Sequence, residues 1–243
     1  MKIIDVSKHN GDIDWKKVKA FGVDGVIIRA GYGRLITQKD KPFDSNYEGA
    51  VAAGLHVGAY WYSYAETPAE ARLEATVFLE AIKGKKFDMP VYFDIEEPKH
   101  VKLSKTICTD IVESFCDTME KAGYFCGVYS FDSFFATNLT ADIQNKYSCW
   151  VARVDGKKPQ SCTVYGMWQN SWKGQISGIS GNVDVSECYT NFPSIITNMG
   201  FNGYGKADTY TVKAEISGVS SSKAATVMTA CKTLGMIVKQ EKE

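Results

Sequence analysis

The sequence predicts an α/β fold: an irregular, TIM-like eight-stranded β/α barrel whose last strands lack full helices, followed by a small C-terminal β-α-β segment. In the first half of the chain, short β-branched and aromatic runs alternate with helical patterns. After about residue 145, the strand-like runs follow one another through short turns. Near residue 200 the composition shifts to glycine and asparagine, which indicates the end of the barrel.

The elements of the barrel are predicted from hydrophobic patterns and from helix end signals. Strands are expected at Ile3–Val6, Gly25–Ala30, His56–Tyr64, Pro90–Ile95, Phe125–Ser130, Cys149–Val154, Tyr165–Asn170 and Asn182–Val185. Helices are expected at Trp15–Phe21, Asn46–Ala53, Pro68–Ile82 and Lys105–Ala122. Thr67 followed by Pro68 is a typical helix start, and Gly123 is a typical helix stop.

The composition argues against several classes of protein. Basic and acidic residues number 28 each, so a general electrostatic nucleic-acid binder is not expected. No apolar run is long enough to span a bilayer, and no membrane insertion is expected. The seven cysteines form no CxxC pair, which favours reduced core residues made in a reducing cytoplasm. The chain enters its first strand at once, so we expect no signal peptide.

The strongest functional signal is the acid pair that follows the apolar run Met89–Phe93. Asp94 and Glu96 are two positions apart, so on a strand their side chains share one side while Ile95 points away. Two carboxylates at the tip of a buried strand are costly unless they serve a purpose. Glycoside hydrolysis needs such a pair, one protonated and one ionised. Taken alone, a solvated strand end or a divalent-metal site explains the pair about as well.

Two further acids belong to strand-like runs at the ends of the barrel. The run Lys2-Ile3-Ile4 leads into Asp5 at the first predicted strand, and the run Gly181-Asn182-Val183 leads into Asp184 at the last one. The first and last strands of a closed barrel are neighbours, so these acids are expected to converge. Together with Asp94 and Glu96 they would place four carboxylates at the rim where β/α barrels carry their chemistry.

The same rim is rich in aromatic and hydrogen-bonding side chains. Tyrosine and tryptophan rings there provide platforms for flat pyranose faces, although alternate members must point into the helix layer. For Arg29 a structural ion pair is an equal alternative to substrate binding. The candidate substrate-binding residues are Tyr32, Tyr60, Tyr62, Tyr129, Trp168, Gln169 and Arg29.

Two rival activities are disfavoured by the residues themselves. The chitinase-type pattern DxxDxDxE needs acids at the positions that Met89 and Tyr92 occupy. A metal-dependent deacetylase needs histidines near the acids, and His9, His56 and His100 lack ligand spacing to one another. We therefore expect no metal and no cofactor.

These motifs resemble the family-25 glycoside hydrolases, the lysozyme (N-acetylmuramidase) family of phages, bacteria and some fungi. The likeness covers about residues 1 to 196, in the family's order and spacing. The matching pieces are Asp5-Val6-Ser7, Ile28–Gly33, Gly58–Tyr62, Tyr92–Glu96, Trp168-Gln169 and Asp184-Val185-Ser186. The resemblance implies hydrolysis of the β-1,4 bond between N-acetylmuramic acid and N-acetylglucosamine in peptidoglycan.

The resemblance also implies a role for each acid. Glu96 matches the general acid, and Asp94 matches the carboxylate that assists at the opposite face of the sugar. Asp5 and Asp184 match the flanking acids of the site. The expected outcome is retention, with attack either by an enzyme carboxylate or by the substrate's own acetamido group.

The favoured biological role is that of a phage endolysin, held in the host cytoplasm until lysis and then acting on the cell wall. One alternative is a bacterial or prophage autolysin with the same chemistry. Another is a catalytically silent barrel that binds wall glycan. The presence of all four acids, with no Asn or Gln in their places, weakens the silent alternative.

The predicted domains are a catalytic barrel at residues 1–196, a linker at 197–207 and a small β-α-β module at 208–243. The module is too short to bury a core alone. It must dock on the barrel, belong to a truncated module or pair with another copy, and we favour self-association. Cell-wall binding by the same segment is also expected from the resemblance.

Overall fold

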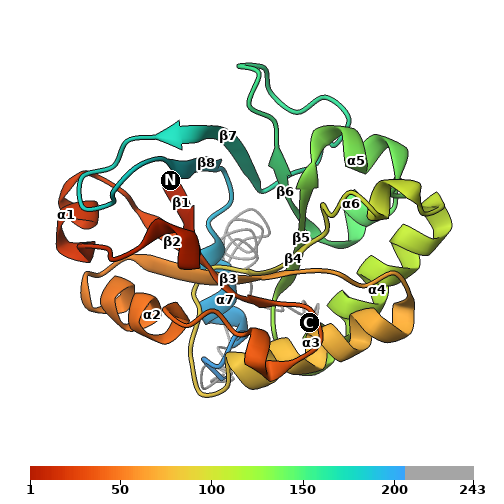
Figure 1. Ribbon diagram of the computed structural model, residues 1–243, viewed down its shortest axis with the longest axis horizontal. Coiled ribbons are helices and arrows are strands. Elements are labelled where there is room, and N and C mark those ends of the chain that lie inside the picture. Colours follow the sequence, from red (N-terminus) through yellow and green to blue (C-terminus); the bar gives the residue numbers. More distant parts are fainter. Residues whose placement is uncertain (206–243) are drawn as a thin grey trace, which may run out of the picture. The chain divides into compact units, whose positions relative to one another are not determined.

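The computed structural model of the chain describes residues 1–205. They form a closed barrel in the order β1 to β8, with helices on the outside (Figure 1). Neighbouring strands from β1 to β7 are parallel, whereas β8 is antiparallel to both β7 and β1. The predicted irregular β/α barrel is confirmed.

The elements of the described part have the following bounds. The strands are β1 (Lys2–Val6), β2 (Gly25–Tyr32), β3 (His56–Tyr62), β4 (Val91–Asp94), β5 (Cys126–Phe131), β6 (Ser148–Ala152), β7 (Met167–Gly174) and β8 (Val183–Cys188). The α-helices are α1 (Trp15–Ala20), α2 (Phe43–Ala52), α3 (Pro68–Ala81), α4 (Lys105–Lys121), α5 (Asp132–Thr137), α6 (Ile143–Lys146) and α7 (Phe192–Met199). The short 3-10 turns are η1 (Lys8–Asn10), η2 (Ile36–Gln38) and η3 (His100–Lys102).

The sequence prediction located every strand and the four helices α1 to α4, and it missed α5, α6 and α7. Each missed helix has at most eight residues, which is too short for a clear helical period. The last strand was predicted at Asn182–Val185, but it spans Val183–Cys188, so its end was predicted too early. Between β6 and β7 the described chain has no helix, as expected for the irregular half of the barrel.

Side chains alternate along the strands between two apolar layers. The inner layer fills the barrel and includes Ile3, Ile27, Tyr92, Tyr129 and Trp150. The outer layer lies between the strands and the helices and includes Ile4, Val26, Trp61, Phe93 and Phe115. Helices α3 and α4 pack side by side over this layer (Figure 1). From α4, Phe115 stacks on Phe93 with ring centroids 4.2 Å apart.

Aromatic rings make the centre of the barrel solid. Around Trp150 lie Tyr129, Tyr92 and Tyr60, with ring centroids 4.5, 5.1 and 6.2 Å away. Space for the Tyr92 ring depends on Gly127, because a Cβ there would lie 2.5 Å from that ring. The barrel is therefore a packed core, and a substrate can enter only at the rim.

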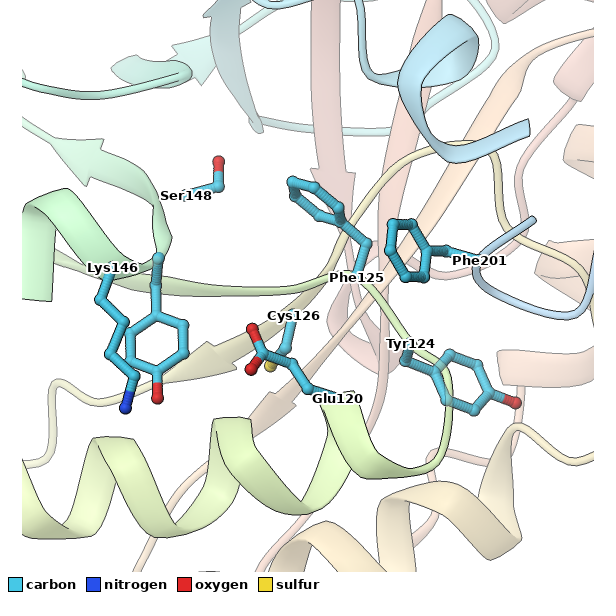
Figure 2. A pocket seen from close by; sticks show the side chains of 8 residues that line it. Glu120, Tyr124, Phe125, Cys126, Lys146, Ser148 and Phe201 are labelled. Atoms are coloured by element: carbon cyan, nitrogen blue, oxygen red, sulfur yellow. The ribbon is translucent and has the colours of Figure 1, made fainter. Parts of the chain in front are cut away.

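The predicted boundary between barrel and linker, at residue 196, comes too early. α7 continues to Met199, and Asn202 is completely buried against the barrel. The Asn202 side chain accepts from the Phe125 backbone N–H at 2.7 Å and donates to the Met89 carbonyl at 2.9 Å. Its neighbour Phe201 packs on Phe125 at the edge of a cavity of about 330 Å³ (Figure 2). The predicted module at 208–243 lies outside the described residues.

We expect Asn202→Ala to lower the free energy of unfolding by about 2–4 kcal/mol, because it strands a buried donor and a buried acceptor. Urea denaturation of the full chain measures this change. Asn202 has φ 53°, a backbone angle that alanine adopts only with strain. Asn202→Gly removes the same side chain without that strain, so it isolates the effect of the lost hydrogen bonds. The exposed Asn198→Ala on the same segment is the control. Equal stability of Asn202→Ala and Asn198→Ala would contradict the proposed anchoring.

Candidate active site

The structure brings Asp5, Asp94, Glu96 and Asp184 together at one rim of the barrel. Asp5 on β1 is paired directly with Asp184 on β8. Asp94 is the last residue of β4, and Glu96 lies two residues further on. Their charges interact: Glu96 and Asp5 both raise the pKa of Asp94, and Asp184 raises the pKa of Glu96. The expected convergence of acids from three strands is present.

Asp184 reaches the rim by a different route from the one predicted. It was expected where the last strand ends, but it is the second residue of β8. Because β8 is antiparallel to its neighbours, its beginning lies at the rim where the parallel strands finish. The direction of β8 thus differs from the prediction, but the Asp184 carboxylate still lies at the predicted rim.

Backbone pairing continues past the end of β4 and holds Glu96 in place. The N–H of Ile95 donates to the Tyr129 carbonyl at 3.1 Å. The Ser130 hydroxyl donates to the Ile95 carbonyl at 2.6 Å. The Ile95 side chain is buried in the outer layer, so the acids on either side of it face the barrel interior.

Burial makes all four acids harder to ionise. Asp94 and Asp5 are only 3% and 8% exposed, and burial raises the pKa of each well above its usual value, assisted by the neighbouring carboxylates. Burial also raises the pKa of Glu96, to about 7, and that of Asp184, to about 6. The site therefore stores protons at pH values where exposed carboxylic acids have lost them.

Gln169 on β7 connects the acids to the aromatic residues. Its carbonyl oxygen accepts from the Tyr129 hydroxyl and from the Trp172 indole N–H, both at 2.9 Å. Indole N–H is only a donor, so this contact fixes the orientation of the amide. Its amide nitrogen then donates to Asp5 at 2.9 Å. Gln169 thus contacts Asp5, and Tyr129 contacts Gln169, so both residues lie at the rim where the sequence predicted them.

Arg29 on β2 has the structural role that the sequence left open, and it also lies within the charge environment of Asp94. Its Nε donates to Asp40 at 2.9 Å, a buried ion pair. Its positive charge also lowers the pKa of Asp94, opposing the effect of burial. Nη2 is buried without a hydrogen-bond partner among the described residues, and so is Oδ1 of Asp94. Arg29 is therefore both a structural anchor and part of the charge environment of the acids.

A cavity of about 370 Å³ lies beside the acids. It is lined by Lys8, His9, Arg29, Tyr32, Tyr62 and Tyr64. Tyr62 connects it to the acids, because the charges of Asp94 and Glu96 raise the pKa of the Tyr62 hydroxyl, in addition to burial. The same hydroxyl donates to Glu97 at 3.0 Å. The predicted residues Tyr32, Tyr62 and Arg29 all belong to this cavity.

Tyr60 lies among the acids, whereas Trp168 does not. Beyond burial, the charge of Asp5 raises the pKa of the Tyr60 hydroxyl. Trp168 pairs with Val151 of the outer layer, and its indole N–H donates to the Arg153 carbonyl at 2.8 Å. It faces away from Gln169 because adjacent strand residues point to opposite sides. The structure gives Trp168 a supporting position on the outer face of β7.

Three residues at the site are not among the candidate substrate-binding residues, although two of them, Tyr64 and Trp172, belong to the aromatic residues expected in or just beyond the strands. Trp172 reaches Gln169 because β7 is irregular between Gln169 and Ser171, which changes the alternation of its side chains. Lys8 and Tyr64 line the cavity from segments just beyond β1 and β3. Tyr64 ends the expected strand His56–Tyr64 and Lys8 follows the expected strand Ile3–Val6, so a rule that selects residues around strand ends would have found both, but nothing in the sequence marks the irregularity in β7.

The remaining features of residues 1–205 do not form a second reactive centre. The cavity in Figure 2 lies at the beginning of β5 and β6, the end of those strands opposite to the acids. Across the described residues, no group of three or more His, Cys, Asp or Glu is arranged to hold a metal ion. Within the same range, no helix combines the length and apolar character needed to cross a membrane.

Comparison with known proteins supports the family suggested by the motifs. The family profile described as glycosyl hydrolases family 25 matches residues 4–179. The autolytic lysozyme of Clostridium acetobutylicum is 32% identical over 189 residues, which are 77% of this chain and 55% of that protein. The chain thus spans about half the length of this relative.

Solved structures that resemble this chain point to the same family. The CTP1L endolysin is 33% identical with a TM-score of 0.70, over 81% of this chain and 69% of that one. The autolysin LytC of Streptococcus pneumoniae, solved with a synthetic peptidoglycan ligand, is 35% identical with a TM-score of 0.68, over 76% of this chain and 46% of that one. The profile match covers more than half of the sequence and includes Asp5, Asp94 and Glu96. The chain therefore belongs to family 25 of the glycosyl hydrolases.

Proposed function

We propose that this protein is a muramidase, which hydrolyses the β-1,4 bond between N-acetylmuramic acid and N-acetylglucosamine in bacterial peptidoglycan. One observation carries the proposal: Glu96, with its pKa raised to about 7, lies among three other carboxylates at the rim of a family-25 barrel. The similarity to an autolytic lysozyme and to an autolysin solved with a peptidoglycan ligand supports this substrate.

Glu96 is the proposed general acid. A group with a pKa of about 7 is still largely protonated just below neutral pH and can protonate the leaving glycosidic oxygen. Burial is the main cause of the raised pKa, and the charge of Asp184 adds to it. Once ionised, the same carboxylate can remove a proton from the water that completes hydrolysis.

Asp94 is the proposed partner at the opposite face of the sugar. Its Oδ1 is buried without a hydrogen-bond partner within the described chain, so a donor group of the bound sugar would satisfy it. Arg29 favours its ionised form. Asp94 either attacks the anomeric carbon or orients the substrate's acetamido group for that attack, and both routes retain the anomeric configuration.

Aromatic rings beside the acids are proposed to hold the sugar rings. Trp172 is 44% exposed and fixed by its hydrogen bond to Gln169. Tyr60 and Tyr62 lie among or beside the acids, and Tyr32 lies in the adjoining cavity. These rings offer apolar faces to the pyranose while their polar atoms bind hydroxyl groups.

For the biological role we propose a phage endolysin, held in the host cytoplasm until lysis and then acting on the cell wall. The similarity to the CTP1L endolysin supports this role, while the two autolysin-type relatives support a bacterial or prophage autolysin. The six cysteines within residues 1–205 are free and buried, which fits synthesis in a reducing compartment. Self-association or wall binding through residues 208–243 stays a prediction.

Glu96→Gln is expected to lower the release of new reducing ends from purified peptidoglycan by about 10²–10⁴-fold, because it removes the transferable proton. The new terminal sugar should be N-acetylmuramic acid. Glu48→Gln, at an exposed position on α2, is the control and should match the wild type. New glucosamine ends would show that a different bond is cleaved. No release by the wild type would favour the silent glycan-binding barrel.

Asp184→Asn is expected to lower the pKa of Glu96, because it removes a negative charge that raises this pKa. The general acid works when protonated, so activity falls as pH rises through its pKa. The alkaline limb of the kcat/KM profile should therefore move to lower pH. An unmoved limb would mean that another group controls this part of the profile.

Tyr129→Phe is expected to shift the same limb in the opposite direction. The Tyr129 hydroxyl interacts with both Gln169 and Glu96, and its interaction with Glu96 lowers the pKa of that acid, so its removal raises that pKa. The matched control is Tyr189→Phe, where an exposed tyrosine donates to Glu187. The hypothesis fails if Tyr129→Phe and Asp184→Asn displace the alkaline limb in the same direction.

A further inference from the structure

We propose that the cavity beside the acids binds a carboxylate carried by the N-acetylmuramic acid of the substrate. This inference rests on the proposed function, because it deepens the assignment of the substrate. The carboxylate belongs either to the lactyl group of the sugar or to the peptide attached to that group. N-acetylglucosamine carries no carboxylate, so the cavity would distinguish the two sugars of the glycan.

The position of the cavity fits a sugar substituent. Arg29 and Tyr62 line it, and Tyr62 is the direct neighbour of Asp94 in the pairing of β3 with β4. The cavity therefore lies within reach of a substituent on a sugar bound at the acids. The volume of about 370 Å³ is larger than a single carboxylate needs and leaves room for the linking atoms.

Lys8 supplies a positive charge that the described protein does not neutralise. It is exposed, its Nζ lies 4.9 Å from the centre of the Tyr32 ring, and it forms no ion pair within residues 1–205. Its backbone N–H donates to Asp40 at 2.9 Å, the same Oδ2 that Arg29 binds. Asp40 thus holds the Arg29 guanidinium and the backbone of Lys8 beside each other at the cavity.

Arg29 supplies further hydrogen-bond donors. Only its Nε is used by Asp40, and Nη2 is without a partner in the described chain. Asp40 forms an ion pair with Arg29, whereas Lys8 has no ion-pair partner among the described residues. A carboxylate placed between the two cations would use these donors and neutralise the charge of Lys8.

The tyrosines complete the lining. Tyr32 and Tyr64 form an edge-to-face pair with ring centroids 5.9 Å apart, and neither hydroxyl is hydrogen-bonded within the described residues. The Tyr62 hydroxyl is already used by Glu97. The cavity therefore combines a positive charge, spare hydroxyl donors and aromatic faces, which suits an anionic sugar substituent better than a neutral one.

The test is the affinity of the full-length Glu96→Gln chain for two forms of the disaccharide N-acetylglucosaminyl-N-acetylmuramic acid. One form keeps the lactyl carboxylate, and the other carries it as a methylamide. NMR titration measures both dissociation constants into the millimolar range. We expect the methylamide to bind about tenfold more weakly, as for the loss of one charged hydrogen bond.

Adding Lys8→Gln should remove this preference, and Lys8→Arg should retain it. Both variants change an exposed side chain, so folding is not at risk. Lys83→Gln, at an exposed position just after α3, is the control and should leave the preference unchanged. A second pair of ligands carries an alanyl-glutamate dipeptide on the lactyl group. The carboxylates of the dipeptide are free in one member of the pair and amidated in the other. The pair with the larger Lys8-dependent preference identifies which carboxylate the cavity binds.

The inference is overturned if neither ligand pair shows a preference, or if Lys8→Gln weakens the charged and amidated forms equally. This readout does not depend on turnover. Peptidoglycan hydrolysis without a carboxylate preference would leave the proposed function intact and reject the inference. A Lys8-dependent preference without hydrolysis by the wild type would reject the proposed function and support a glycan-binding barrel that uses this cavity.

Discussion

The hydrogen-bonded pairing of β1 with β8 closes the barrel and also brings Asp5 opposite Asp184. The rest of the site depends on this contact, because it joins acids that lie at opposite ends of the barrel sequence. The main-chain nitrogen of Met1 donates to the Cys188 carbonyl at 2.8 Å, and the Cys188 N–H donates to the Met1 carbonyl at 2.9 Å. Without closure, the first and last strands would be exposed edges and the rim would lose two of its four carboxylates.

Collecting these carboxylates in a buried site has a cost in stability. Each acid has a raised pKa in the folded chain, so the folded state loses stability as pH rises through those values, about 6 for Asp184 and about 7 for Glu96. The cost has two sources, which are loss of hydration and repulsion between like charges. The loss of hydration and the repulsion also keep Glu96 protonated near neutral pH. The two effects that destabilise the fold are therefore the ones that the proposed general acid needs.

Two polar networks position the side chains around the acids. On one side, Gln169 joins Asp5, Tyr129 and Trp172 through an amide of fixed orientation. On the other side, Asp40 accepts hydrogen bonds from the Arg29 side chain and from the backbone N–H of Lys8. Each network is centred on a buried side chain with several partners, Gln169 or Asp40, which limits movement of the groups that face the substrate. The rigid aromatic packing beneath them serves the same purpose.

Local alternation and motif spacing were enough to predict the family, the order of the strands, the main helices and the candidate acids Asp94 and Glu96. The direction of β8, the outward position of Trp168 and the inward position of Trp172 became visible only in the folded chain. The folded chain also showed that Asn202 belongs to the barrel. These features depend on hydrogen bonds between segments far apart in the chain and on a strand irregularity, and neither leaves a periodic pattern in the sequence.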